Sequence, residues 1–445
     1  MTFRRRCAFR ACVLLVAQLQ IPAAGAEPAM RAPLTLQEAV SAALAGNPEL
    51  RTFEFQLRAQ DARTRQAGQR PAPEVSLELE NALGSGDYRG AESLEATLAL
   101  SQVIELSSKR EARVATAQAG RNVLDVERQA RQLDVLAEVT RRFIEVASRQ
   151  EYLRLAGIAR NLAQQTIAAT EKRVNAAKSP HAELDRAHIA LDRADLAERR
   201  AVAELDAARQ QLAATWGESR PVIAGIPFGA VGANLYRLPP TGDYTELLGR
   251  VEANPDFLRF ASEARLRDAE LRLAAALRKP DFTLAGGVRR LQASRDEALV
   301  ASFSVPLFSG RRAKGYIAEA QARRDSLGAE RQIAQVRAQA TLYQLHQELS
   351  YAVLEAGTLS SDTLPRSDEA LKETEYAYER GRYSYLELVD AQREYLDLQG
   401  ALIDAATDAH QLRAEIERLT NAPLTLDSAD ELSQPSGDQP TPRAE

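Results

Sequence analysis

The chain has 445 residues, of which 45% are apolar, 27% charged and only 5% aromatic, and its formal net charge is −5. That length is enough for about three domains or for one very elongated structure, and the composition favours long exposed helices over a sheet-rich enzyme. Four histidines and two cysteines leave little for a dense metal or redox site, and the acidic balance argues against a general nucleic-acid binder, which would carry a basic stripe.

Residues 1–26 have the pattern of a signal peptide. Four arginines precede a short apolar run over 11–19, and the small residues Ala24, Gly25 and Ala26 form a cleavage motif. The run is too short to span a bilayer as a helix. Cleavage would remove both cysteines, so we expect an exported protein without disulfides. A cytosolic protein with an apolar first helix is the alternative.

The sequence repeats itself once. Asn47-Pro48-Glu49 returns as Asn254-Pro255-Asp256, and three further ordered matches follow at similar offsets. They pair Pro73 with Pro280, 107–110 with 309–312, and 183–187 with 387–391. Several ordered matches indicate a duplication. The sequence therefore predicts one repeat over 34–217, a Gly/Pro-rich linker over 218–237 and a second repeat over 238–421.

Each repeat is expected to contain a short helix, two strands and two long helices. The predicted strands lie at about 74–80, 94–106, 281–291 and 298–308, and the predicted long helices at about 109–178, 181–216, 311–380 and 385–421. The proline-containing tail over 422–445 is expected to be disordered.

The strand segments alternate apolar and polar residues. Val75, Leu77 and Leu79, for example, alternate with glutamates and a serine. Such alternation over about 9–11 residues is typical of a tilted membrane-crossing strand. Four strands cannot close a barrel, and open edges in lipid would cost several kcal/mol for each unsatisfied backbone group, so strands from several chains must join. A pair of amphipathic hairpins capping a soluble bundle is the alternative.

The long helices predict two antiparallel hairpins. In the last helix Leu388, Leu402 and Ile416 belong to a seam of residues seven apart, which is typical of coiled-coil packing. The helix over 109–178 would reach roughly 105 Å, and Pro365 should kink the one over 311–380. We call the turns between the paired helices the first tip (176–183) and the second tip (380–386). A simple coiled-coil rod would show the same seam.

In the order and wording of its motifs, the chain resembles the TolC-like outer-membrane efflux proteins, specifically their cobalt–zinc–cadmium resistance (CzcC-type) branch. The motifs that carry the resemblance are 34–40 with 47–50, 70–81, 102–110, 306–312 and 381–393. The resemblance implies a mainly α fold with a small membrane β-barrel portion. It implies a homotrimer in which twelve strands, four from each chain, form the barrel above a periplasmic α-helical tunnel.

The same resemblance implies a passive export duct in the Gram-negative outer membrane, for divalent heavy-metal cations. Its implied partners are outer-membrane lipid, a periplasmic adaptor protein and an inner-membrane RND pump. It implies no enzyme activity, no cofactor and no nucleic-acid partner. A periplasmic adaptor and an exported structural coiled coil are the alternative functions. An adaptor would have one central hairpin, and a rod would not explain four alternating segments.

The resemblance also indicates where the functional residues lie. Glu387 and Asp390 match acidic positions that narrow the periplasmic mouth, with Arg382 as a basic neighbour, and Tyr378 matches a position that links neighbouring hairpins. Ordinary exposed helix charges are the alternative for the two acids. The residues expected to contact the adaptor are Lys178, Ser179, Pro180, Gly381, Tyr383 and Ser384. The first tip departs from the branch pattern, which usually has a glycine there.

No constellation of residues points to catalysis or to tight metal binding. His181, His188, His346 and His410 are scattered, and none has a cysteine or second histidine three or four positions away. A duct needs no tight site, because a conduit that bound its cargo tightly would not release it.

Overall fold

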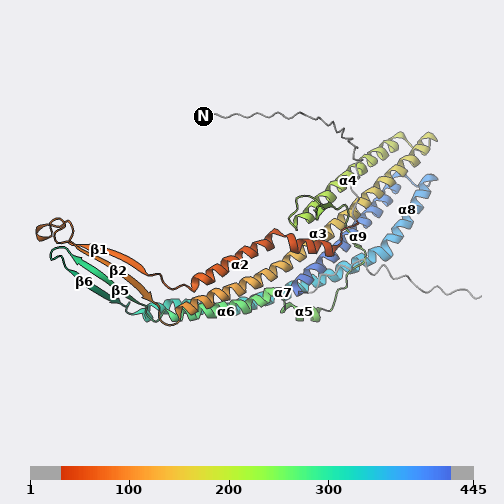
Figure 1. The fold of residues 1–445 in the computed structure, drawn as a ribbon. Helices are drawn as coiled ribbons and strands as arrows, with labels where there is room; N and C mark the ends of the chain where they lie inside the picture. Colours follow the sequence, from red (N-terminus) through yellow and green to blue (C-terminus); the bar gives the residue numbers. More distant parts are fainter. Residues whose placement is uncertain (1–31, 422–445) are drawn as a thin grey trace, which may run out of the picture.

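The computed structural model describes residues 32–421, and the predicted signal peptide and tail lie outside this range. The molecule is long, with a sheet at one end, hairpin tips at the other and helices between them (Figure 1). Of the helices within 32–421, none combines the length and apolarity needed to cross a bilayer.

The elements follow in the same order in the two predicted repeats. The first contains α1 (Leu36–Gly46), α2 (Pro48–Ala67), β1 (Glu74–Glu80), β2 (Glu95–Ile104), α3 (Lys109–Asn175) and α4 (His181–Ala214). The second contains α5 (Tyr244–Val251), α6 (Pro255–Ala276), β5 (Phe282–Leu291), β6 (Glu297–Ser304), α7 (Ser309–Thr358), α8 (Leu364–Glu379) and α9 (Tyr385–Thr420). A small hairpin, β3 (Val222–Ile223) with β4 (Ile226–Pro227), lies in the linker. All four strands of the sheet lie close to their predicted positions.

The four strands form one antiparallel sheet in the order β1-β2-β5-β6. Leu77 is paired with Leu98, Leu98 with Val288, and Val288 with Leu299, so one apolar row crosses all four strands. The next row is polar at Glu78, Thr97 and Arg289, because successive side chains point to opposite faces. Leu299 is 89% exposed and Leu77 65% exposed, so nothing within residues 32–421 covers the apolar face.

The helices form an arc in which α3 is continuous, α7 leads into α8, and two further members are made of separate helices. The long helix α3 contacts α2 and α6 in the half nearer the sheet, and α4 and α9 in the half nearer the tips (Figure 1). In the same way α7 contacts α6 and α9. Thus α4 and α2 together form one interrupted helix beside α3, and α9 and α6 together form another beside α7.

Two buried asparagines join these pieces. The side-chain oxygen of Asn47 accepts hydrogen bonds from the first N–H groups of α2, while its amide donates to the carbonyl of Thr215 at the end of α4, at 2.8 Å. Asn254 does the same for α6 and donates to the carbonyls of Arg418 and Leu419 at the end of α9. One side chain therefore satisfies unpaired backbone groups of two helices at once.

Pro365 interrupts the predicted helix over 311–380. A π-helical segment, Leu359–Thr363, separates α7 from α8. Proline cannot donate the backbone bond that α-helical geometry requires, and the hydroxyls of Ser360 and Ser361 donate to the carbonyl of Gly357. At the predicted kink, the helix changes from α to π geometry for one short segment before Pro365.

Replacing Asn254 by alanine should destabilise the fold by about 1–3 kcal/mol, because two helix-end carbonyls and one first-turn N–H lose their partner. Thermal unfolding in detergent would measure the loss. Asn234→Ala is the matched control, because Asn234 is exposed and bonds only a neighbouring loop N–H. An equal effect of both substitutions would contradict the role of Asn254 as a joint.

Candidate functional site at the hairpin tips

The two tips are built on turns of similar shape but with different caps. Ala177 in the first tip and Gly381 in the second both have positive φ angles, of 56° and 76°. In the second tip Ser384 and Glu387 form a capping box, with the Ser384 N–H 2.7 Å from the Glu387 carboxylate. Pro180 caps the first tip and has no hydroxyl or N–H to offer, so the equivalent Glu183 makes no such box, and its buried Oε2 atom has no hydrogen-bond partner within residues 32–421.

Tyr378 is the buried centre of the contact between the hairpins. It is fully buried near the end of α8, and its hydroxyl lies 2.9 Å from that of Thr170 on α3. Its neighbours in the apolar cluster include Ala187 of the first hairpin and Leu388 of the second. Within this single chain, Tyr378 therefore contacts residues of both hairpins.

Arg173 at the end of α3 reaches both tips, and the sequence analysis missed it. Its guanidinium lies over the Tyr378 ring at 4.3 Å and donates to the carbonyls of Tyr378 and Tyr383. Its Nε also donates to the hydroxyl of Ser179 at 2.9 Å. No motif or repeat match marks Arg173, because its partners are mostly backbone carbonyls about 205 positions away.

A second buried polar pair lies one turn above this contact. Thr166 of α3 and Gln392 of α9 are both buried, and the Gln392 amide donates to the Thr166 hydroxyl at 3.0 Å. Thr166, Thr170 and Arg173 are spaced four and three apart, so they line one face of α3. This face of α3 makes hydrogen bonds to the second hairpin. Hydrogen bonds are directional, so they fix the orientation of the second hairpin more closely than apolar packing would.

The predicted gate acids are exposed at the start of α9. Glu387 and Asp390 both face solvent within one chain, and hydrogen bonds from the backbone N–H and hydroxyl of Ser384 hold the pKa of the Glu387 carboxyl below its ordinary value. Arg382 is also exposed, and its side chain makes no hydrogen bond or ion pair within 32–421, although its backbone N–H donates to Ala377. Within one chain, Glu387 is therefore bonded to Ser384 and not to Arg382.

The residues predicted to contact an adaptor lie on the tip surface. Lys178, Pro180, Gly381, Tyr383 and Ser384 are exposed, whereas Ser179 is half-buried because it bonds Arg173. Within the described chain, no group of three or more metal-binding side chains is arranged to hold an ion.

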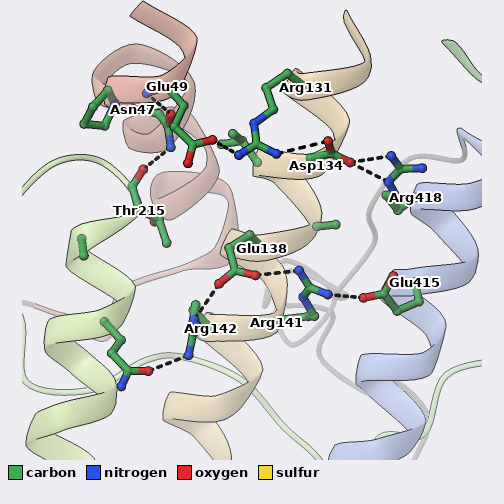
Figure 2. A pocket seen from close by; sticks show the side chains of 15 residues that line it. Asn47, Glu49, Arg131, Asp134, Glu138, Arg141, Arg142, Thr215, Glu415 and Arg418 are labelled. Atoms are coloured by element: carbon green, nitrogen blue, oxygen red, sulfur yellow. Dashed lines mark hydrogen bonds and ion pairs between the residues drawn. The ribbon is translucent and has the colours of Figure 1, made fainter. Parts of the chain in front are cut away.

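A charged cavity of about 850 Å³ lies far from the tips, where the asparagine joints are (Figure 2). Arg131 bridges Glu49 and Asp134, and Arg418 continues the chain of ion pairs from Asp134 to Asp256. Burial by itself would lower the pKa of Arg418, but the bonds with Asp256 and Asp134 outweigh it and raise the pKa. These ion pairs link the residues that follow the Asn-Pro motifs of the two repeats. The charged side chains that line the cavity therefore connect the two repeats to each other.

The sequence and the fold both match known proteins. Residues 39–218 match the family model described as outer membrane efflux protein. The cobalt-zinc-cadmium resistance protein CzcC of Cupriavidus metallidurans is 28% identical over 384 residues, which is 84% of this chain and 88% of that protein. Outer membrane protein OprJ of Pseudomonas aeruginosa is 28% identical over 177 residues, 35% of this chain and 34% of OprJ.

Two solved structures illustrate the likeness in fold. The outer-membrane channel OprN has a TM-score of 0.70 at 19% identity, over 87% of this chain and 90% of its own. The outer membrane protein VceC of Vibrio cholerae has a TM-score of 0.67 at 19% identity, over 88% of this chain and 97% of its own. The predicted fold class, long helical hairpins with a small strand portion, is thereby confirmed.

Replacing Tyr378 by phenylalanine should leave the buried Thr170 hydroxyl without its partner, at a cost of about 1–3 kcal/mol. Hydrogen–deuterium exchange should then speed up around 168–175 and 372–380. Tyr376→Phe is the matched control, because Tyr376 lies on the same helix but is 54% exposed. If exchange is unchanged in Tyr378→Phe, the hydroxyl pair does not hold the hairpins together.

Proposed function

We propose that the chain is a member of the outer membrane efflux protein family, whose model it matches over residues 39–218, and that it forms a passive homotrimeric export duct for divalent heavy-metal cations. As a member of this family, it is an outer-membrane efflux channel. A duct has no chemical step to catalyse, so the proposal includes neither an enzyme activity nor a cofactor. The free edges of the single chain are the observation that carries the proposal.

The sheet and the helix arc both end in edges that need a partner. Strands β1 and β6 are the outer strands and each pairs on one side only. In the arc of helices, the outer helices expose large apolar side chains, among them Leu196 of α4 (64%) and Leu354 of α7 (66%). Unequal edges fit a head-to-tail contact, which closes into a ring. Three copies would give the twelve strands that the family resemblance implies, and they would leave no strand edge exposed to lipid.

The similarity to the cobalt–zinc–cadmium resistance branch is what supports the proposed cargo and partners. The name of the relative CzcC mentions cobalt, zinc and cadmium, and this supports divalent cations as cargo. The face opposite the apolar row of the sheet carries Glu74, Glu78, Glu80 and Glu95, with Arg289 as a basic residue between the last two. An acidic lining would attract cations without retaining them. We extend the proposal to a periplasmic adaptor at the tips and an inner-membrane RND pump as energy source.

Two alternative functions fit the chain less well. A periplasmic adaptor should have one hairpin, whereas this chain has α3 with α4 and α8 with α9. A structural coiled coil has no need for a four-stranded sheet with an uncovered apolar face.

A charge on the apolar face should prevent assembly. Leu77 is central in β1 and 65% exposed, and arginine there would cost about 2–4 kcal/mol near the bilayer midplane. We expect the wild type in mild detergent to have the mass of three chains by light scattering, and Leu77→Arg to lose this species. Glu78→Gln, on the opposite face, should keep it. A monodisperse folded wild-type monomer would exclude the barrel.

Neutralising the proposed gate should change ion selection. Three copies of Glu387 and Asp390 would form acidic rings just inside the mouth, so Glu387→Gln with Asp390→Asn should weaken cation preference and divalent block in single-channel recordings across planar bilayers. Glu394→Gln with Asp397→Asn, an equal charge change at exposed positions further along α9, should have a smaller effect. Unchanged selectivity and block in the first variant would mean that these acids are only a solvated helix face.

A further inference from the structure

We propose that Arg289 is a specificity-determining residue of the duct, a built-in counter-ion whose bonds to Glu80 and Glu95 prevent this acid pair from retaining cations. The inference rests on the proposed function, because it concerns how cations pass the sheet. It explains how a mainly acidic lining can attract cations and still release them.

The register of the sheet brings two like charges together. Glu80, the last residue of β1, is paired directly with Glu95, the first residue of β2. Both side chains lie on the polar face, because each is two positions along its strand from the polar row at Glu78 and Thr97. Carboxylates directly opposite each other repel and destabilise a sheet. A positive group beside them is therefore stabilising.

Arg289 of β5 supplies this positive group. Its two terminal nitrogens each lie 2.9 Å from a carboxylate oxygen, one of Glu80 and one of Glu95. Its Nε donates to the Thr97 hydroxyl, also at 2.9 Å, and the amide of Asn81 donates to the other oxygen of Glu95 at 3.2 Å. The planar guanidinium fork thus contacts both acids at once, in an orientation that the Thr97 bond helps to fix.

The acid pair is open to water but already has its cation. The side chains of Arg289, Glu80 and Glu95 are 30%, 42% and 24% exposed, so dissolved cations can approach them. Carboxylate oxygens bind divalent cations in proteins. A dissolved cation must displace the guanidinium before it binds, and the guanidinium is tethered to the strand, so its local concentration is high. Passing cations are therefore attracted to this face without being held by the pair.

The next residue along β5 provides a comparison within the same strand. Arg290 has the same charge as Arg289, but it points to the opposite face. There it forms an ion pair with Glu297 of β6 at 3.3 Å, and this is its only acidic partner within residues 32–421. The two adjacent arginines are thus a matched pair for an experiment, because only Arg289 contacts the acids of the polar face.

Single-channel recording of the full-length protein in planar bilayers, with Co²⁺ as the probe, tests the counter-ion. Arg289→Gln should lower the Co²⁺ concentration that halves the current by at least about tenfold, because a positive charge beside the acid pair is lost. Arg290→Gln should match the wild type, and Arg289→Lys, which keeps the charge, should lie closer to the wild type than to Arg289→Gln. Light scattering should give the same trimer mass for all four proteins, because partly exposed ion pairs contribute little stability.

A second substitution locates the block at the acid pair. Adding Glu95→Gln to Arg289→Gln should return the half-blocking Co²⁺ concentration to near the wild-type value, because one of the two carboxylates is gone. A block that Glu95→Gln does not relieve would arise elsewhere in the channel and would overturn the counter-ion.

Chemical rescue separates the charge from any change in folding. Both cysteines of the sequence precede residue 27, so Arg289→Cys introduces the only thiol of residues 27–445. Reaction with the positively charged aminoethyl methanethiosulfonate should relieve the Co²⁺ block in the channel being recorded, whereas the neutral methyl reagent should not.

The outcomes distinguish the counter-ion from the duct. Arg289→Gln channels that Co²⁺ blocks no more strongly than the wild type, or equal relief by the charged and neutral reagents, would overturn the counter-ion and leave the duct intact. A wild-type protein that forms no pore would overturn the duct, and the counter-ion with it.

Discussion

The need to satisfy helix ends in the middle of a long molecule governs this structure. Four helix ends meet halfway along the arc, and each would leave backbone groups unpaired. Asn47 and Asn254 resolve this by capping one helix while donating to the carbonyls of another. Because the joints are short and buried, α4 and α2 together extend along α3, and α9 and α6 together extend along α7.

The same region fixes the two repeats to each other. The ion pairs from Glu49 through Arg131, Asp134 and Arg418 to Asp256 begin and end beside the two asparagine joints. The two ion pairs of Arg418 are partly buried, so they are screened less than the more exposed pair between Arg131 and Glu49. The middle of the molecule is thus held in a single arrangement by bonds that involve both copies of the Asn-Pro motif.

The half nearer the tips is held together differently. There the hairpins meet through a few polar side chains on α3, and α8 is separated from α7 by a π segment. These pairs are buried, so breaking one of them would leave a polar group without a partner, and they therefore fix how the two hairpins lie against each other.

The sequence by itself determined the elements of this protein, the faces of its strands and its similarity to outer membrane efflux proteins. Period-two alternation around Leu77, the heptad seam through Leu388 and the stop at Pro180 are local signals, and the corresponding elements lie close to the predicted positions. Only the tertiary structure decided that β2 pairs with β5, that Pro365 produces a π turn and that Arg173 bonds the second hairpin. The physical reason is that some of these features join residues nearly 200 positions apart, which no local pattern can reveal. Others depend on backbone carbonyl acceptors, and every residue has a backbone carbonyl whatever its side chain.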